Sequence, residues 1–316
     1  MFKYTIKRLL QSLVTVLIVV TIVFLLMRLL PTDYYFTEDQ LIKFTDAQKE
    51  DALRAAGLLD SLPKQLFRFY GQLLRLDFGQ SRRIQAGIDV TKVIGQKFQV
   101  SMKMGIISLA ISLLIGIVMG ILQTRFKDRL VDHIGTAYTV FVNAVPALVS
   151  YSLIMVFGAK VLHLPSMYST RKPIPSSILP IACLSLASIA GYALWTRRYM
   201  VDEINKDYIK LAKVKGMSTK AIMVKHVLRN AFVPLAQYLP ASLLLTISGS
   251  LLAERFFSVP GMGPLLTDAI NRYDTSVVQT LVILYATLSV LGVFLGDVLM
   301  MLIDPRIRLT DKEGAR

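Results

Sequence analysis

Long apolar runs, separated by polar and basic stretches, dominate the pattern along the chain. A helix that crosses a bilayer needs about 20 mainly apolar residues in a row. We expect six such helices, at residues 9–30, 99–123, 134–160, 178–196, 233–253 and 277–301. Pro146 and Pro180 interrupt or bound two of them, and such breaks are tolerated where neighbouring helices or water satisfy the freed carbonyl groups. The pattern predicts an all-α, polytopic membrane protein that forms a single domain over residues 1–316.

The composition agrees with a membrane protein. Of the 316 residues, 54% are hydrophobic and 18% are charged, whereas soluble domains average about 25% charged residues. The formal net charge of +15 would suit nucleic-acid binding, but the basic residues are spread over the loops between apolar runs, as the positive-inside rule describes. We therefore expect the lipid bilayer as a partner, and no nucleic acid. Cys183 is the only cysteine, which excludes a disulfide framework and a cysteine-based metal cluster.

The distribution of Lys and Arg predicts the orientation in the membrane. The richer side carries Lys3, Lys7, Arg8, Arg125, Lys127, Arg129, Arg197, Arg198, Lys206, Lys210, Lys213, Lys215, Lys220, Lys225, Arg229, Arg306, Arg308, Lys312 and Arg316. The short loops of the other side carry only Lys160, Arg171, Lys172, Arg255 and Arg272. The loop 31–98 is also basic, but loops longer than about 60 residues cross the membrane largely regardless of charge. Both termini are therefore expected in the cytoplasm.

The long loop at residues 31–98 has helical spacing of its own. Apolar positions predict helices over residues 46–56 and 63–76. Gly57 stands where a helix stops, and Pro63 stands in a first turn. We expect a helical extracellular cap that covers the outer mouth.

A basic stretch at residues 197–232 lies between two apolar runs and predicts a helix, a break and a second helix. Gly216 can take the positive φ that ends a helix over 207–215. Ser218 or Thr219 can cap a second, amphipathic helix that runs to about Asn230. Such a helix can sit in a partner's groove or rest on anionic lipid. The spacing alone favours neither.

Ionisable groups inside the apolar runs are scarce. Arg28 and Lys103 lie near the outer ends of their runs, where long side chains can reach the interface. Asp297 lies deeper, and it is either a proton or cation site or a carboxylate paired with a neighbouring helix or subunit. No second buried acid or histidine accompanies it to form a relay, which favours the pair. Gly116-x-x-x-Gly120 and Gly292-x-x-x-Gly296 are either close helix-packing faces or ordinary small residues.

A membrane protein that moves a solute needs an energy source, and this sequence shows none of its own. Moving a two-state equilibrium from 1:99 to 99:1 takes about 5.5 kcal/mol of differential binding, which an ion-coupled carrier would take from buried charges. The phosphate-binding pattern G-x-x-x-x-G-K-[ST] is absent from the sequence. By elimination, we expect a nucleotide-binding partner to supply the energy. An ion-coupled secondary carrier that needs Asp297, and a scaffold without a pore, remain the alternatives.

Specific motifs resemble one family. The basic stretch contains Asp207-Tyr208-Ile209, Ala212, Lys215-Gly216 and His226-x-Leu228-Arg229-Asn230-Ala231-x-x-Pro234. Further matches are Gly57-Leu58, Asp77-Phe78-Gly79, Glu254-x-x-Phe257-Ser258-x-Pro260-Gly261-Met262-Gly263 and Asp304-Pro305-Arg306-Ile307-Arg308. These resemble the oligopeptide/dipeptide/nickel-type permease subunits of ATP-binding-cassette importers, in particular their B-type subunit. Lys210 at the leading glutamate position, and Leu76 where a glycine commonly precedes Asp77, depart from the pattern.

The resemblance implies a type I importer permease, a six-span half of a heterodimeric pore in a bacterial cytoplasmic membrane. The implied partners are a second permease, two ATP-binding subunits and an extracellular solute-binding protein. The chain itself is then no enzyme, with no catalytic residue, metal or cofactor, since ATP and magnesium bind to the ATPase subunits. Short peptides are the expected substrate, with nickel or other metal chelates and glutathione-like solutes as alternatives.

The resemblance also assigns residues to two sites. The ATPase-coupling residues are Ala212, Lys215, Gly216, Met217, Ser218, Lys220, Ala221, Val224, His226, Arg229 and Asn230. The residues of an outer gate or a contact with the binding protein are Phe257, Pro260, Gly261 and Gly263. A tight turn without a direct role is the alternative for this second group.

Overall fold

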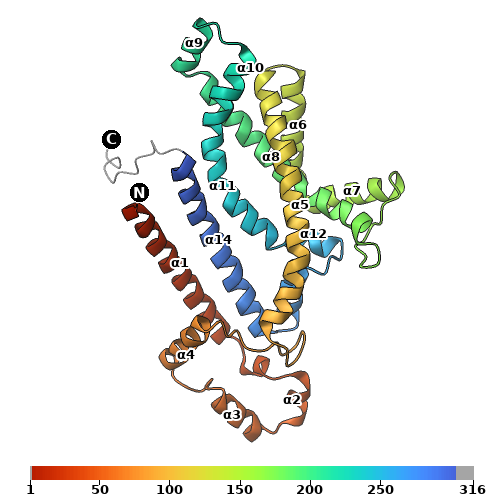
Figure 1. Cartoon of the computed structure of the whole chain (residues 1–316). Coiled ribbons are helices and arrows are strands. Elements are labelled where there is room, and N and C mark those ends of the chain that lie inside the picture. Colours follow the sequence, from red (N-terminus) through yellow and green to blue (C-terminus); the bar gives the residue numbers. More distant parts are fainter. Residues whose placement is uncertain (1, 304–316) are drawn as a thin grey trace.

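The computed structural model describes residues 2–303, and most of this range is helical (Figure 1). The long elements are α1 (Phe2–Arg28), α5 (Val90–Arg125), α6 (Leu130–Ala144), α7 (Ala147–Lys160), α8 (Pro173–Ile204), α11 (Arg229–Ile247) and α14 (Thr275–Ile303). The short elements are η1 (Thr32–Tyr35), α2 (Glu38–Lys43), α3 (Asp46–Ala55), α4 (Leu62–Leu74), α9 (Asp207–Val214), α10 (Thr219–Ile222), η2 (Met223–Leu228), α12 (Leu251–Phe256) and α13 (Met262–Asn271). No strand occurs within residues 2–303, so the all-α prediction is confirmed. The motif at residues 304–308 and the basic residues after it lie outside the described residues.

Within the described chain, five helical runs are long and apolar enough to cross a membrane: α1, α5, α8, the run Thr219–Phe256 and α14. α6 and α7 meet at an angle of 113° and pass the same test together, which gives up to six spans if the bent pair is one span. The bend lies at Pro146, and Val145 before it has extended backbone, because a proline ring disfavours helical backbone in the preceding residue. Helices overlie all six predicted ranges, whose positions in a bilayer stay a prediction.

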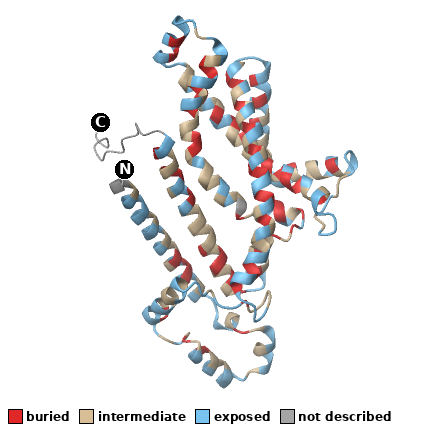
Figure 2. Cartoon of the chain, in the orientation of Figure 1, coloured by how far each residue is buried: buried red, intermediate tan, exposed pale blue. Residues whose placement is uncertain are grey.

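The pairs α5–α8 and α11–α14 pack so closely that only glycine fits at the contact. A Cβ atom added to Gly120 of α5 would lie 2.6 Å from the Cβ atom of Thr196 in α8. A Cβ atom added to Gly296 of α14 would lie 2.1 Å from the backbone oxygen of Gln237 in α11. Gly116 and Gly292 make similar contacts one turn away. Both small-residue patterns are therefore close packing faces, as in other membrane helices, and Figure 2 shows buried residues along α5 and α8.

Asp297 of α14 is paired. Its Oδ2 atom lies 3.3 Å from Nε of Arg8 in α1, and its Oδ1 atom accepts a hydrogen bond of 3.0 Å from Nε2 of Gln237 in α11. The side chain of Asp297 is only 7% exposed, so the two partners offset the cost of burying a carboxylate. The expectation of a paired carboxylate is confirmed.

A second buried carboxylate, Asp274, joins the start of α14 to the loop before α5. It caps α14, and its Oδ2 atom accepts hydrogen bonds from Oγ of Ser81 at 2.6 Å and from three consecutive backbone N–H groups, those of Arg82 at 3.1 Å, Arg83 at 2.9 Å and Ile84 at 3.0 Å. Asp274 is fully buried. Residues that are 190 positions apart are thereby fixed to one another at the cap end of the bundle.

The cap has the two predicted helices and two more. α3 and α4 agree with the predicted ranges 46–56 and 63–76, Gly57 has φ +68° after α3, and Pro63 lies in the first turn of α4. η1 and α2 had no recognised signal, although Thr37 caps α2 with a reciprocal pair of hydrogen bonds to Gln40, the pattern of a capping box.

Leu76, which departs from the pattern that the sequence resembles, has φ +56°. The amide of Leu76 donates to the carbonyl of Leu73, and the amide of Asp77 donates to the carbonyl of Gln72. These two bonds form a Schellman motif at the end of α4, whose left-handed position usually holds glycine. A side chain there is strained.

We predict that Gly296→Ala lowers the thermal stability of the purified protein. The added methyl group meets backbone rather than a movable side chain, and overpacking of this kind costs about 1–3 kcal/mol. Gly95→Ala in α5 is the control, because nothing lies within 4 Å of its added Cβ atom. Thermal unfolding in detergent should show a lower midpoint for Gly296→Ala only, and equal midpoints would contradict the close contact.

We predict that Leu76→Gly raises stability. Left-handed backbone costs a non-glycine residue about 1–2 kcal/mol. The greater freedom of glycine in the unfolded chain offsets about 0.5–1 kcal/mol of the stability gained. Leu76 is 71% exposed, so little packing is lost. Leu74→Gly, at an 86% exposed helical position two residues earlier, should instead lower the unfolding midpoint. A fall for both variants would show that Leu76 is not strained.

Candidate functional site

The basic segment (residues 197–232) leaves the bundle at the end of α8 and returns through α11. Its helix α9 projects at the end of the bundle opposite the cap, and α10 lies next to it, near the ends of α5 and α6 (Figure 1). A partner that approaches this end of the bundle can therefore reach them.

Gly216 ends α9 as the sequence predicted. Its φ is +76°, its amide donates to the carbonyl of Lys213 at 3.0 Å, and the amide of Met217 donates to the carbonyl of Ala212 at 3.2 Å. Nothing lies within 4 Å of an added Cβ atom, so the backbone conformation and not the available space selects glycine. Oγ of Ser218 then accepts a hydrogen bond from the amide of Ala221 and caps α10, as expected.

The expectation that the second helix ends near Asn230 is wrong. The chain stays helical from Thr219 through α10, η2 and α11 to Ile247. No residue between Gly216 and Gly249 has left-handed backbone, and Pro234 removes one helical hydrogen bond without ending the helix. Within this run η2 is a π-helical turn, a feature frequent at functional sites. The basic segment and the next apolar run are thus one continuous rod.

The segment has a small apolar core of its own. The buried residues are Met200, Ile209, Ala212, Ile222, Met223, Val227 and Ala231. They come from α8, α9, α10, η2 and α11, so the short helices are packed onto the ends of the long ones. Ala212, a predicted coupling residue, faces inward in this core.

Side-chain hydrogen bonds join α9 of the basic segment to the end of α8 and the start of α11. Oη of Tyr208 in α9 donates to Oε1 of Glu203 in α8, and Nδ2 of Asn230 in α11 donates to Oη of Tyr208 at 2.7 Å and to Oε1 of Glu203 at 3.3 Å. Burial and the hydrogen bond to Glu203 raise the pKa of Tyr208, so the phenol remains a donor. Three helices are connected at one point by these bonds.

The outward face of the segment is both apolar and basic. Leu211 and Val214 of α9 are 55% and 84% exposed, and Val224 is 55% exposed. Of the predicted coupling residues, Lys215, Gly216, Ser218, Lys220, Val224, Arg229 and Asn230 are exposed, and Met217, Ala221 and His226 are half-buried. Sequence reasoning missed Leu211 and Val214. Their helical offset from the inward residues Ile209 and Ala212 is the signal that places them on the opposite face.

The second predicted group lies in the outer loop (residues 250–263), where a buried carboxylate holds the chain. Oε1 of Glu254 accepts a hydrogen bond from the amide of Ser250 at 3.3 Å, and its Oε2 atom accepts one from the amide of Gly263 at 2.9 Å. Ser101 of α5 accepts a hydrogen bond of 2.9 Å from the amide of Met262. Glu254 is 1% exposed. Its two donors fold the loop around the carboxylate, and the bond to Ser101 holds the loop against α5.

The glycines of the outer loop make room for this carboxylate. A Cβ atom added to Gly261 would lie 2.4 Å from Oε2 of Glu254, and one added to Gly263 would lie 2.7 Å from the Cα atom of Leu251. Phe257, Gly261 and Gly263 are buried, and only Pro260 of the four predicted residues is partly exposed. In this arrangement three of the four shape the loop, and Pro260 is the one within reach of a partner.

No group of three or more His, Cys, Asp or Glu side chains in the range 2–303 is arranged to hold a metal ion.

Comparisons with known proteins agree on one family. The family described as "Binding-protein-dependent transport system inner membrane component" matches residues 112–309. The dipeptide transport system permease protein DppB of Lactococcus lactis is 32% identical over 98% of this chain and 100% of that protein. The oligopeptide transport system permease protein OppB of Haemophilus influenzae is also 32% identical, over 98% of this chain and 100% of that protein.

Two further comparisons match a smaller part of this chain. The oligopeptide transport system permease protein AmiC of Streptococcus pneumoniae is 35% identical over 66% of this chain, which spans only 42% of that protein. Among solved structures, the MetNI methionine ABC transporter in inward-facing conformations has a TM-score of 0.53 at 14% identity, over 68% of this chain and 97% of that chain. At this identity the likeness shows the fold alone.

We predict that Asn230→Ala loosens α9. The variant loses two hydrogen bonds that join α11 to α8 and α9, each worth about 0.5–1.5 kcal/mol. Only the bond to Tyr208 reaches α9, so amide hydrogen exchange in residues 207–214 should speed up by about 2- to 10-fold, the value of one such bond. Asn205→Ala is the control, because the side chain of Asn205 donates to the carbonyl of Val201 in its own helix. Equal exchange in both variants would show that the network does not hold α9.

Proposed function

This chain belongs to the family of binding-protein-dependent transport system inner membrane components, and we propose that it forms half of a pore that imports short peptides. Membership makes it a multi-pass membrane permease of an ATP-binding-cassette importer, with the all-α fold of the type I group. The names of relatives that match the chain over nearly its full length refer to dipeptide and oligopeptide transport. Those names support peptides as the substrate.

One observation carries the proposed mechanism: the basic segment is a folded unit that exposes apolar side chains at its far end. Leu211, Val214 and Val224 are more than half exposed. Lys213 lies in α9 with Leu211 and Val214, and Lys220 lies in α10, which η2 with Val224 continues. We infer that this face docks in a groove of an ATPase subunit. Because α10, η2 and α11 form one rod, a push on α10 moves α11 directly.

The proposed partners follow from this arrangement. A second, homologous permease completes a heterodimeric pore, two ATP-binding subunits bind ATP and magnesium, and an extracellular solute-binding protein delivers the peptide. The chain itself then carries out no covalent chemistry. The exposed Pro260 of the outer loop is the proposed contact with the binding protein. Asp297 is not proposed as an ion site, since it is paired with Arg8.

We propose that the basic segment and both termini are cytoplasmic and that the cap is extracellular. The excess of Lys and Arg in the basic segment supports this orientation. The start of α1 and the end of α14 lie toward the same end of the bundle as α9, opposite the cap (Figure 1). A bacterial cytoplasmic membrane is the proposed location.

The test is Gly216→Val in the complete importer, reconstituted in proteoliposomes with ATP. Valine at φ +76° is strained by roughly 1–2 kcal/mol, which should displace the end of α9 without affecting membrane insertion. We expect peptide uptake per ATP hydrolysed to fall severalfold. The measurement is the simultaneous rate of labelled tripeptide uptake and of phosphate release.

Gly87→Val is the matched control. Gly87 has φ +80°, nothing lies within 4 Å of its added Cβ atom, and it lies near the cap end of the bundle. The control should keep the wild-type ratio of uptake to hydrolysis. An unchanged ratio in Gly216→Val would reject the docking assignment, and peptide uptake without ATP would reject the ATP-driven mechanism.

A further inference from the structure

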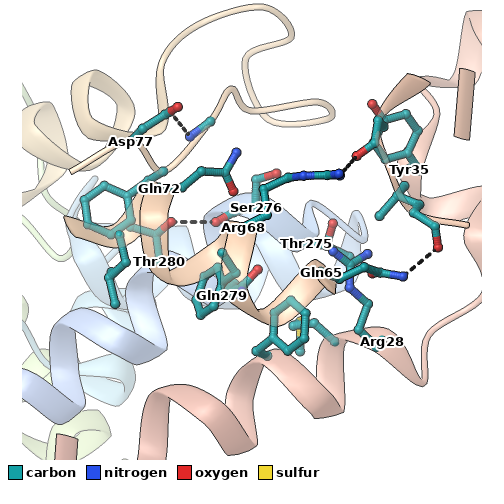
Figure 3. A pocket seen from close by; sticks show the side chains of 18 of the residues that line it. Arg28, Tyr35, Gln65, Arg68, Gln72, Asp77, Thr275, Ser276, Gln279 and Thr280 are labelled. Carbon is teal, nitrogen blue, oxygen red and sulfur yellow. Dashed lines mark hydrogen bonds between the residues drawn. The ribbon is translucent and has the colours of Figure 1, made fainter. Parts of the chain in front are cut away.

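A cationic cavity of about 350 Å³ lies at the cap end of the protein, between α1, α4, the loop before α5 and the start of α14 (Figure 3). Three arginines line it: Arg28 at the end of α1, Arg68 of α4 and Arg82 of the loop. Its volume is within the range of about 300–1,000 Å³ typical of small-ligand sites. Neither the family nor the coupling mechanism assigns it a role.

The cavity has an excess of positive charge. Arg68 is paired at 2.6 Å with Asp60, and hydrogen bonds from Lys64 and Arg68 lower the pKa of Asp60, so that carboxyl is ionised. Within residues 2–303, no carboxylate lies within ion-pair distance of Arg28 or Arg82. Asp77 is the only acidic residue among those that line the cavity. At least one positive charge is therefore left without a counter-charge, and a monoanion would balance it.

The arginines are held in place for a ligand. Nη1 of Arg82 donates to the carbonyl of Tyr35, and the guanidinium lies 3.5 Å from the centre of the Tyr35 ring. Arg28 lies 5.0 Å from the centre of the Phe24 ring. Stacking on rings fixes a guanidinium and leaves other N–H groups free to donate.

A buried acceptor completes the polar wall. Gln65 of α4 is 6% exposed, and its Nε2 atom donates to the carbonyls of Leu58 and Asp60. Its Oε1 atom is buried and has no hydrogen-bond partner within the described chain. A buried acceptor without a donor costs about 1–3 kcal/mol, which a hydroxyl group on a ligand would remove. An anion that also carries a hydroxyl group would balance the excess positive charge and donate to Oε1 of Gln65.

The surroundings are those of a membrane surface. Phe24 and Phe69 stack at 5.0 Å on the apolar side of the cavity. The outward residues of α1 just before and after Arg28 are apolar, since Leu26 is 53% and Leu29 is 82% exposed. α4, which crosses the end of α1, exposes Phe67 at 77%. Apolar side chains next to three arginines suit an amphiphile at the membrane interface. Its anionic group would contact the arginines, and its apolar chains would contact the apolar side chains.

We propose that this cavity binds the phosphodiester of an anionic phospholipid from the leaflet on the cap side. Arg28 and Arg82 donate to the phosphate oxygens, Gln65 accepts a hydrogen bond from a hydroxyl of the headgroup, and the acyl chains lie along the exposed face of α1. The single negative charge and the two hydroxyls of phosphatidylglycerol match the charge and the acceptor of the site. Free phosphate lacks the apolar part that Phe24 and Phe69 would contact.

The test uses the assembled importer, depleted of lipid in detergent, with dioleoyl phosphatidylglycerol as the probe. Bound lipid is counted by native mass spectrometry over a range of lipid concentrations. Arg28→Gln should weaken binding of the probe about tenfold or more, the loss expected for a hydrogen bond to a charged group. Arg28 has no ion pair among the described residues, so its replacement leaves the fold in place. Arg171→Gln, an exposed outer arginine away from the cavity, should bind the probe like the wild type.

Competition identifies the source of the anion. Dioleoyl phosphatidylcholine should bind more weakly than the probe, because it has no net charge and no hydroxyl. Inorganic phosphate or a short peptide that displaces the probe completely would overturn the lipid assignment and mark an anion or substrate subsite. Equal binding by the wild type and Arg28→Gln would also overturn it. The readout is lipid binding and not transport, so a failure here leaves the proposed function untouched.

Discussion

The carbonyl oxygen of Gln237 lies where a side chain on Gly296 would begin, and Thr196 stands in the same relation to Gly120. In a bilayer, apolar side chains gain little by leaving lipid for a helix interface, so close backbone approach is the main source of attraction between helices. These two contacts fix α5 against α8 and α11 against α14. Since the basic segment hangs between α8 and α11, and the cap is tied to α5 and α14, both ends of the molecule depend on the same glycine contacts.

The two ends use polar groups in different ways. At the end with the basic segment, Glu203, Tyr208 and Asn230 are partly accessible and connect three helices. At the cap end, Asp274 and Glu254 are buried and accept hydrogen bonds from backbone amides. Accessible networks of side chains can rearrange at modest cost, whereas a buried carboxylate that loses its donors is strongly destabilised. The arrangement suits a protein that moves at one end and stays rigid at the other.

Much of the fold could be predicted from local signals. Apolar runs located the long helices, and Gly57, Gly216 and Ser218 marked the ends of short ones, because a helix end depends on a few neighbouring residues. The pairing of Asp297 was predicted because no second acid or histidine in the apolar runs accompanies it to form a relay. The helix expected to stop near Asn230 did not, because a proline in a helix weakens one turn and need not end it.

Other features depend on contacts that no local pattern reveals. The inward position of Phe257, Gly261 and Gly263 follows from the approach of Glu254 and Ser101, which are far apart in the sequence. The cationic cavity joins Arg28 to Gln279 across most of the chain. The outward position of Leu211 and Val214 is an exception, because each lies two residues after an inward residue of the same helix, Ile209 or Ala212.

The hydrogen bonds accepted by Asp274 also constrain the order in which the chain can fold. During synthesis, the amides of Arg82, Arg83 and Ile84 emerge about 190 residues before the carboxylate that accepts their hydrogen bonds. These hydrogen bonds therefore cannot form until Asp274, which directly precedes α14, has been synthesised. In a chain cut short before α14, the amides of Arg82, Arg83 and Ile84 would lack this acceptor.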